Sequence, residues 1–213
     1  MKNDEGNEKI VISRRRAGVA DIDIIRAIAR RAFPATYRDI LSPEQLAYMM
    51  EWMYSEESLR RQMGEEGQVF FLALFNGRPC GYVSIERQEE DLFHLQKIYL
   101  SPDFQGIGLG HYLFGTALEH IRRVHPSPCR MELNVNRHNS ARRFYERMGM
   151  TCLRSGDFDI GNGFFMNDYI MGMEIGTETD LQRTSLPSAE YIYRRIQAKW
   201  PQNKKIAVIL QSF

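Results

Sequence analysis

The sequence predicts an α/β (α+β) protein with a mixed, mostly antiparallel central sheet flanked by helices. Three observations support this: three helical segments follow the first expected strand, an Asn-Gly dipeptide at residues 76–77 joins two apolar runs, and a strand–helix–strand pattern follows. Asn-Gly between apolar runs is typical of a two-residue hairpin. A meander followed by strand–helix–strand predicts one sheet with both kinds of pairing.

Length and composition limit the possible classes. A chain of 213 residues, 43% of them hydrophobic, can form one sizeable domain with an appendage. The formal net charge of +1 favours neither a nucleic acid nor a membrane partner. Apolar runs stay below the ~18 residues of a membrane span, and the start of the chain lacks a signal-peptide core. We therefore expect a cytoplasmic protein.

The cysteines and histidines predict no metal site. Cys80, Cys129 and Cys152 are odd in number and widely spaced, so we expect reduced thiols in the core. The five histidines show no paired helical spacing with an acid. We divide the chain into a disordered tail (residues 1–9), a main domain (10–176) and a C-terminal extension (177–213).

The first part of the main domain is expected to contain a strand and three helices. Residues 10–16 alternate weakly, as in a strand. Asp21 is positioned to cap the next helix, and Pro34 should end or kink it. Ser42 followed by Pro43 predicts the start of a second helix, and a short third helix should follow it.

The rest of the domain reads mainly as strands. Polar or turn-forming residues separate apolar runs. The expected strands are residues 69–75, 80–85, 92–100, 130–135, 151–160 and 164–175. Helices are expected after the glycines near residue 108 and over residues 139–148.

The extension has its own signals. Ser188 can cap a helix that Pro201 stops, and residues 206–210 read as a strand. Three interpretations stay open: an ordinary stabilising segment, an added edge strand, or an arm that forms a homodimer.

Residues 95–113 organise the chain, because they are expected to form a strand, a glycine-rich turn and the start of a helix. Glycines at 106, 108 and 110 let a ligand approach the backbone closely. The free N–H groups and the positive dipole end of a helix start favour an anion. The pattern predicts a phosphate or pyrophosphate site, and a turn without a ligand is the alternative.

Two other nucleotide motifs are excluded. No Gly-Lys-Ser/Thr is present, so the turn is not the P-loop of an NTPase. A dinucleotide fingerprint needs an acidic residue at the end of the next strand, about 20 residues on. Glu132 stands instead in the middle of that strand.

The segment Gln105-Gly106-Ile107-Gly108-Leu109-Gly110 resembles the Gln/Arg-x-x-Gly-x-Gly/Ala signature of the GCN5-related N-acetyltransferases, the GNAT family. Residues 139–150 resemble the second landmark of that family, Asn-x-x-Ala-x-x-Phe-Tyr-x-x-x-Gly-Phe, with Met150 in place of the final Phe. The resemblance covers residues 10–175 and implies the acyl-CoA N-acyltransferase fold. Residues 33–44 look similar to PaiA-type bacterial polyamine acetyltransferases.

The resemblance implies acetyl-CoA as co-substrate. The pantetheine would pair with the backbone at the end of the central strand, and the Leu100 N–H would face the acetyl carbonyl. The turn would hold the pyrophosphate, with Gln105 and His111 at its margins. Asn139 would bind the pantetheine, or else cap a helix. The implied cofactor-binding residues are Ile98, Tyr99, Leu100, Gln105, Gly106, Ile107, Gly108, Leu109, Gly110, His111, Asn139 and Tyr145.

Acetyl transfer also needs an acid and a base. Tyr145 resembles the tyrosine that protonates the departing thiolate, and packing beside Phe144 is the alternative. Some family members carry a Glu on the central strand where this chain has His94, eleven positions before Gln105. His94 is the first candidate for the base and Glu86 the second. The alternative for His94 is an ordinary packed or surface histidine.

The expected activity is an N-acetyltransferase whose primary amine acceptor attacks directly in a ternary complex. An acidic set follows the first helix and could attract a polyamine or other small amine, unless it is simply a solvated face: Glu44, Glu51, Glu56, Glu57, Glu65 and Glu66. The alternatives are a non-catalytic acyl-CoA sensor and a protein or peptide N-acetyltransferase. A DNA-associated regulator has only the basic run at residues 14–16 in its favour.

Overall fold

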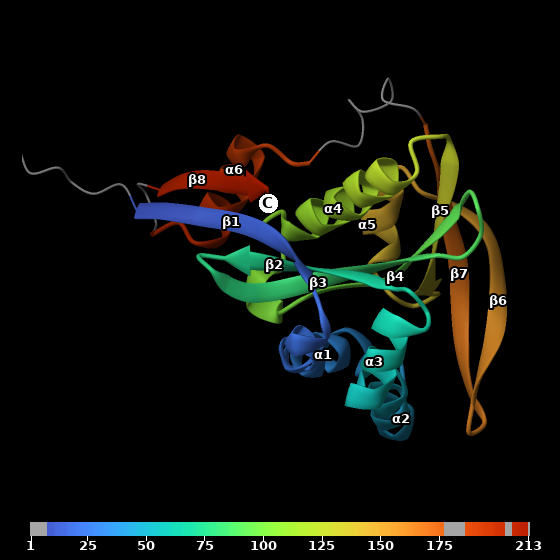
Figure 1. Cartoon of the computed structure of the whole chain (residues 1–213). Coiled ribbons are helices and arrows are strands. Elements are labelled where there is room, and N and C mark those ends of the chain that lie inside the picture. The colour runs from blue at the N-terminus through green and yellow to red at the C-terminus, as the bar shows by residue number, and fades with distance from the viewer. Residues whose placement is uncertain (1–7, 177–185, 203–205, 213) are drawn as a thin grey trace, which may run out of the picture.

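The computed structural model describes residues 8–176, 186–202 and 206–212. These residues form one mixed sheet with helices on both faces (Figure 1). Residues 1–7 of the expected tail lie outside the described residues, whereas residues 8 and 9 begin the first strand. No helix in the described ranges is long and apolar enough to cross a bilayer.

The sheet has the order β6-β7-β5-β4-β3-β2-β1-β8. Most neighbours are antiparallel, and the pairs β4–β5 and β1–β8 are parallel. This confirms the mixed, mostly antiparallel sheet. The strands are β1 (Glu8–Ala17), β2 (Val69–Phe75), β3 (Arg78–Arg87), β4 (Leu92–Leu100), β5 (Cys129–Asn136), β6 (Thr151–Gly161), β7 (Phe164–Ile175) and β8 (Ile206–Ser212).

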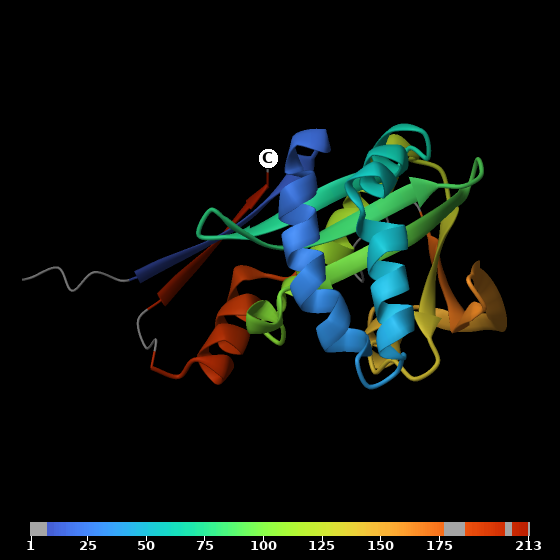
Figure 2. The same ribbon diagram turned by 90° about the horizontal axis from the view of Figure 1, so that it is seen from below.

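The helices cover the two faces of the sheet in two groups (Figures 1 and 2). The first face carries α1 (Ile22–Tyr37), α2 (Pro43–Tyr54) and α3 (Glu56–Gly64). The other face carries α4 (Leu109–Val124), α5 (Arg142–Arg147) and α6 (Ala189–Lys199). Short 3-10 turns, η1 (Val19–Asp21) and η2 (Pro102–Phe104), precede α1 and follow β4.

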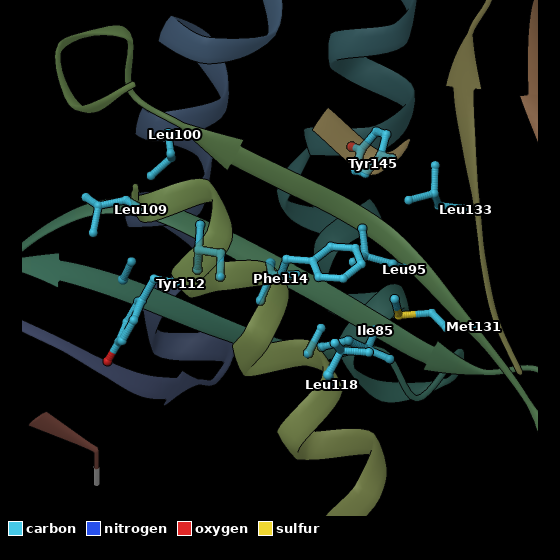
Figure 3. Packing of buried hydrophobic residues seen from close by; sticks show 14 of the residues in the cluster. Ile85, Leu95, Leu100, Leu109, Tyr112, Phe114, Leu118, Met131, Leu133 and Tyr145 are labelled. Carbon is cyan, nitrogen blue, oxygen red and sulfur yellow. The ribbon is translucent and has the colours of Figure 1, made fainter. Parts of the chain in front are cut away.

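Each face of the sheet has its own hydrophobic core. The larger core lies between the sheet and α4 (Figure 3). There Leu109, Leu113, Ala117 and Ile121 are fully buried, as their spacing predicted. The smaller core lies under α1, α2 and α3.

The hairpin turn and two helix caps that the sequence predicts are present in the structure. Asn76 and Gly77 both have positive φ, 49° and 76°, as a type I′ hairpin turn requires. The Ser42 hydroxyl accepts from the Gln45 N–H at 3.2 Å, and the Ser188 hydroxyl accepts from the Tyr191 N–H at 3.1 Å. The extension therefore begins its helix at the expected cap.

Two expectations for α1, that Pro34 ends the helix and that Asp21 caps it, were wrong. The helix runs past Pro34 to Tyr37, and the Pro34 carbonyl accepts from the Arg38 N–H at 3.0 Å. A kink at Pro34 stays a prediction. The Asp21 carboxylate does not cap α1. It accepts instead from Arg15 at 2.6 and 2.8 Å, and from the Gly18 N–H at 3.0 Å. The hydrogen bond from Arg15 lowers the pKa of Asp21.

Cys80 and Cys129 are buried, but Cys152 is exposed, so the expectation of three core thiols was wrong for this residue. Cys152 belongs to β6, which lies at one edge of the sheet and is exposed along nearly its whole length. A position on an edge strand leaves such a side chain outside the core.

The extension adds an edge strand to the sheet. β8 pairs in parallel with β1 over residues 206–212, so the interpretation as an added strand corresponds to the structure. The Tyr112 hydroxyl of α4 donates to the Gln211 carbonyl of β8 at 3.1 Å.

Candidate active site

A cavity opens where β4 and β5 separate. The two strands pair only from Leu92 to His94 on β4, whereas β4 remains paired with β3 as far as Leu100. Beyond His94 the β5 side of β4 faces a cavity of about 960 Å³. Figure 3 shows Tyr145 in the gap, with Leu95 on β4 and Leu133 on β5. The backbone of β4 is therefore accessible to an extended ligand.

The glycine turn forms one end of this cavity. Gly106 and Gly108 have φ of 82° and 91°, a region that residues with a side chain seldom adopt. Gly106, Gly108 and Gly110 line the cavity, and their N–H groups donate no hydrogen bond within the described part of the chain. The side chains of Ile107 and Leu109 are fully buried in the core, which anchors the turn.

Gln105 and His111 flank the turn and line the cavity, as expected. The Gln105 amide donates to the Leu100 carbonyl at 3.3 Å, so this side chain links the turn to the end of β4. The His111 ring contacts Tyr191 of α6, with 5.7 Å between ring centroids.

The end of β4 places one N–H toward the cavity. Ile98, Tyr99 and Leu100 all line it. Successive N–H groups of a strand point to opposite edges, and the Ser101 N–H donates to the Cys80 carbonyl of β3 at 2.9 Å. The Leu100 N–H therefore points to the β5 side, where the cavity lies.

Tyr145 lies on α5 and lines the cavity, with 8% of its surface exposed. Burial raises the pKa of its hydroxyl, which keeps the group protonated at neutral pH. No described residue forms a hydrogen bond with this hydroxyl, which leaves it available to a ligand.

Asn139 also lines the cavity, but its side chain has a local role. Its Oδ1 accepts from the Ala141 N–H at 2.9 Å, so it forms the turn before α5. The helix expected over residues 139–148 is shorter in the structure, Arg142–Arg147, because this turn precedes it.

His94 and Glu86 face each other across β4 and β3, and neither lines the cavity. His94 Nε2 lies 3.2 Å from Asn134 Oδ1, and its buried Nδ1 has no partner among the described residues. Burial lowers the pKa of His94 below its usual 6.5. The Glu86 carboxylate accepts from the Gln96 amide at 2.7 Å.

Two residues near the cavity, Asn134 and Asp168, had no part in the sequence prediction, and Tyr37 entered it only within the segment 33–44. Asn134 lines it and donates to the Asp168 carboxylate at 3.2 Å, which links His94 to Asp168. Asp168 is 2% exposed, and burial raises its pKa. Tyr37 lines the cavity from the end of α1, and its side chain interacts with those of Tyr99 and Asn139. The signal available in the sequence was two asparagines inside the apolar strand 129–136.

The acidic set expected to attract a cationic acceptor does not line the cavity. Glu56, Glu57 and Glu65 line a separate hollow on α3, together with Arg60 and Arg61. The carboxylate that does line the cavity is Asp39, just after α1.

Groups of three or more His, Cys, Asp or Glu able to hold a metal ion were not found among the described residues.

Comparison with known proteins gives the family. A family model described as acetyltransferase (GNAT) domain matches residues 37–169. An uncharacterized N-acetyltransferase of Mycobacterium tuberculosis is 28% identical over 162 residues, which cover 74% of this chain and 99% of the relative. Another, from Lactobacillus delbrueckii subsp. lactis, is 30% identical over 150 residues, which cover 67% of this chain and 86% of the relative.

Solved structures show the same fold. PaiA N-acetyltransferase from Thermoplasma acidophilum, in complex with coenzyme A, superposes with a TM-score of 0.63 at 24% identity, covering 76% of this chain and 98% of that one. The spermidine/spermine N-acetyltransferase SpeG from Vibrio cholerae superposes with a TM-score of 0.58 at 17% identity, covering 82% of this chain and 98% of that one. From the family match and the fold, we conclude that the chain belongs to the GNAT family of N-acetyltransferases.

Proposed function

We propose that the chain transfers the acetyl group of acetyl-CoA to a primary amine by direct attack in a ternary complex. The observation that carries this proposal is the cavity between β4 and β5, which brings together the glycine turn, the Leu100 N–H and the Tyr145 hydroxyl. The turn would bind the pyrophosphate through its backbone N–H groups. The β4 backbone would pair with the pantetheine in the place that a neighbouring strand leaves open.

The proposed reaction assigns a role to each of these groups. The amine nitrogen forms a bond to the acetyl carbon, and the Leu100 N–H stabilises the oxyanion. When the intermediate collapses, the C–S bond breaks and the Tyr145 hydroxyl donates to the thiolate. The acceptor arrives as an ammonium ion and gives one proton to a base before the attack. After the attack its nitrogen loses a second proton, which restores the Tyr145 hydroxyl. The raised pKa of Tyr145 ensures that the donor is protonated throughout the neutral range.

His94 is the proposed acceptor of the amine proton. Its lowered pKa keeps the imidazole neutral at pH 7, as a base requires. It reaches the cavity only through Asn134, so we propose that a water carries the proton between the amine and the imidazole. Glu86 is the second candidate, and its carboxylate is already engaged by Gln96.

The proposed acceptor is a polyamine or another small amine. The support is the fold shared with PaiA and with a spermidine/spermine N-acetyltransferase, together with Asp39 and Tyr37 at the α1 end of the cavity. Asp39 would attract the cationic amine. A peptide amine is the alternative acceptor, and a non-catalytic acyl-CoA sensor is the alternative function.

A matched pair of substitutions tests the pyrophosphate site. Gly106 has positive φ and open space where a Cβ would lie, and Asn and Asp both tolerate this backbone region. Gly106→Asp adds a carboxylate beside the phosphates, so we expect at least about tenfold weaker acetyl-CoA binding than for Gly106→Asn, by calorimetry. Equal affinities would contradict the proposed site.

Thiol release with a panel of amines then separates the functions. An acetyltransferase releases CoA only when its acceptor is present. Binding of acetyl-CoA without amine-dependent release would favour the sensor, and release with peptides alone would favour the peptide acceptor.

A further inference from the structure

The C-terminal helix α6 lies against the glycine turn, far from it in sequence. Figure 2 shows α6 beside the segment that joins β4 to α4. Ile192 and Ile196 are fully buried in the larger core, which fixes α6 to the domain. A Cβ on Gly108 would lie 3.1 Å from Cε1 of Tyr191, so the helix and the turn are in close contact. The family match ends at residue 169, so α6 is a feature outside it.

Two cations of α6 bind the carbonyl groups of this turn. The Lys199 ammonium donates to the carbonyls of Asp103 and Gln105, at 2.7 and 2.6 Å. Arg195 Nε donates to the Gly106 carbonyl at 3.0 Å. Carbonyl oxygens beside a phosphate site repel an anion, and these hydrogen bonds reduce that repulsion. The N–H groups of Gly106 and Gly108 remain without a partner in the described chain.

Arg195 retains most of its donors. Its Nε is fixed on Gly106, and the rest of its guanidinium has no partner among the described residues. The side chain lines the cavity together with Gly106, Gly108 and His111. A guanidinium presents its N–H groups as a fork that matches two phosphate oxygens. The hydrogen bond to Gly106 holds this fork next to the proposed pyrophosphate site.

We propose that α6 forms an outer wall of the cofactor site and that Arg195 donates to a phosphate group in the nucleotide part of acetyl-CoA. The inference rests on the proposed function, because it needs acetyl-CoA in this cavity. It assigns a binding residue to the C-terminal extension, in addition to the edge strand β8. The phosphate is either the diphosphate or the 3′-phosphate, and both have the same chemistry toward a guanidinium.

Substitution of Arg195 tests the proposal against a matched control. Arg195→Gln keeps a polar side chain that can reach Gly106 and removes the charge. Arg194→Gln removes the same charge from the next position, where the arginine is exposed and paired with Glu190 at 2.8 Å. We expect Arg195→Gln to weaken CoA binding about tenfold and Arg194→Gln to change it less than twofold. Arg195→Lys, which keeps the charge and loses the fork, should fall in between.

Two ligands separate the possible contacts in calorimetry, and turnover of a third tests for a structural defect. If Arg195→Gln weakens the binding of CoA and of 3′-dephospho-CoA equally, Arg195 contacts the diphosphate. If it weakens the binding of CoA alone, Arg195 contacts the 3′-phosphate. Turnover of acetyl-pantetheine, which has no nucleotide, should be the same for wild type and Arg195→Gln. A loss with acetyl-pantetheine would show a general structural defect and overturn the proposal.

Two other results would also overturn it. Unchanged CoA affinity in Arg195→Gln would leave Arg195 as a packing residue, and tighter binding would mean that α6 obstructs the site. If Arg195→Gln melts at a lower temperature than wild type, the CoA affinity of Arg195→Lys is measured instead. Unchanged or tighter binding in that variant would overturn the proposal in the same way. Failure of the wild type to bind CoA would instead refute the proposed function.

Discussion

Substitution of Tyr145 by Phe separates a catalytic hydroxyl from a structural one. The Tyr145 ring is buried, and its hydroxyl forms no hydrogen bond with any described residue. Tyr145→Phe therefore loses no internal hydrogen bond and keeps the ring packing. We expect a change in the free energy of unfolding within about 0.5 kcal/mol.

The effect on turnover should be much larger. A positioned general acid contributes about 10²–10⁴-fold to rate, or ~3–5 kcal/mol of activation free energy. We expect kcat for CoA release to fall by about 10²-fold or more, while calorimetric affinity for acetyl-CoA changes less than about threefold, because the hydroxyl acts on the leaving thiolate.

Tyr169→Phe is the matched control. Tyr169 does not line the cavity, and Phe keeps the ring over which the Arg142 guanidinium lies at 4.5 Å from the centroid. This variant should have the wild-type kcat. A wild-type kcat in Tyr145→Phe, with the same melting temperature, would refute the role of Tyr145 as acid and leave it as a packing residue beside Phe144.

The remaining predictions concern the base and the end of β4. For His94→Ala we expect slower turnover at neutral pH and loss of the acid limb of the pH profile of kcat/KM. In the wild type this limb should lie below pH 6.5, because burial lowers the pKa of His94 and a base is inactive once it is protonated. A limb that persists in the variant would exclude His94. For Gly81→Ala we expect a loss of about 2–3 kcal/mol in the free energy of unfolding, measured in urea, because the new Cβ would lie 2.4 Å from Leu100 Cδ2 and 2.6 Å from the Tyr99 carbonyl oxygen. Gly64→Ala, which meets no atom within 4 Å, is its control and should unfold no more easily than wild type.

Local patterns predicted much of the fold because their causes are local. The spacing of Leu109, Leu113, Ala117 and Ile121 placed the buried face of α4, and Asn76-Gly77 placed the hairpin turn. A helix face and a type I′ turn depend on residues a few positions apart. The same holds for the Ser188 cap of α6. Pro34 shows the limit, since the flanking hydrogen bonds of α1 continued past it.

The site was predicted in part. The glycine turn, Leu100 and Tyr145 do line one cavity, as the two landmarks implied. His94 was chosen as the candidate base by counting back from Gln105. In the structure it does not line the cavity, and Asn134 lies between them. Counting along a strand gives a residue's position but not the depth of its side chain, because this depends on where the neighbouring strand β5 separates.

The sequence by itself determined most of the helices and strands, the mixed sheet and the glycine turn. Only the tertiary structure decided that β5 leaves β4 after His94, and that α6 returns to the turn, where Arg195 meets Gly106 across 89 positions of chain. Such contacts follow from how buried surfaces pack once the chain has closed long loops, and no local periodicity encodes them.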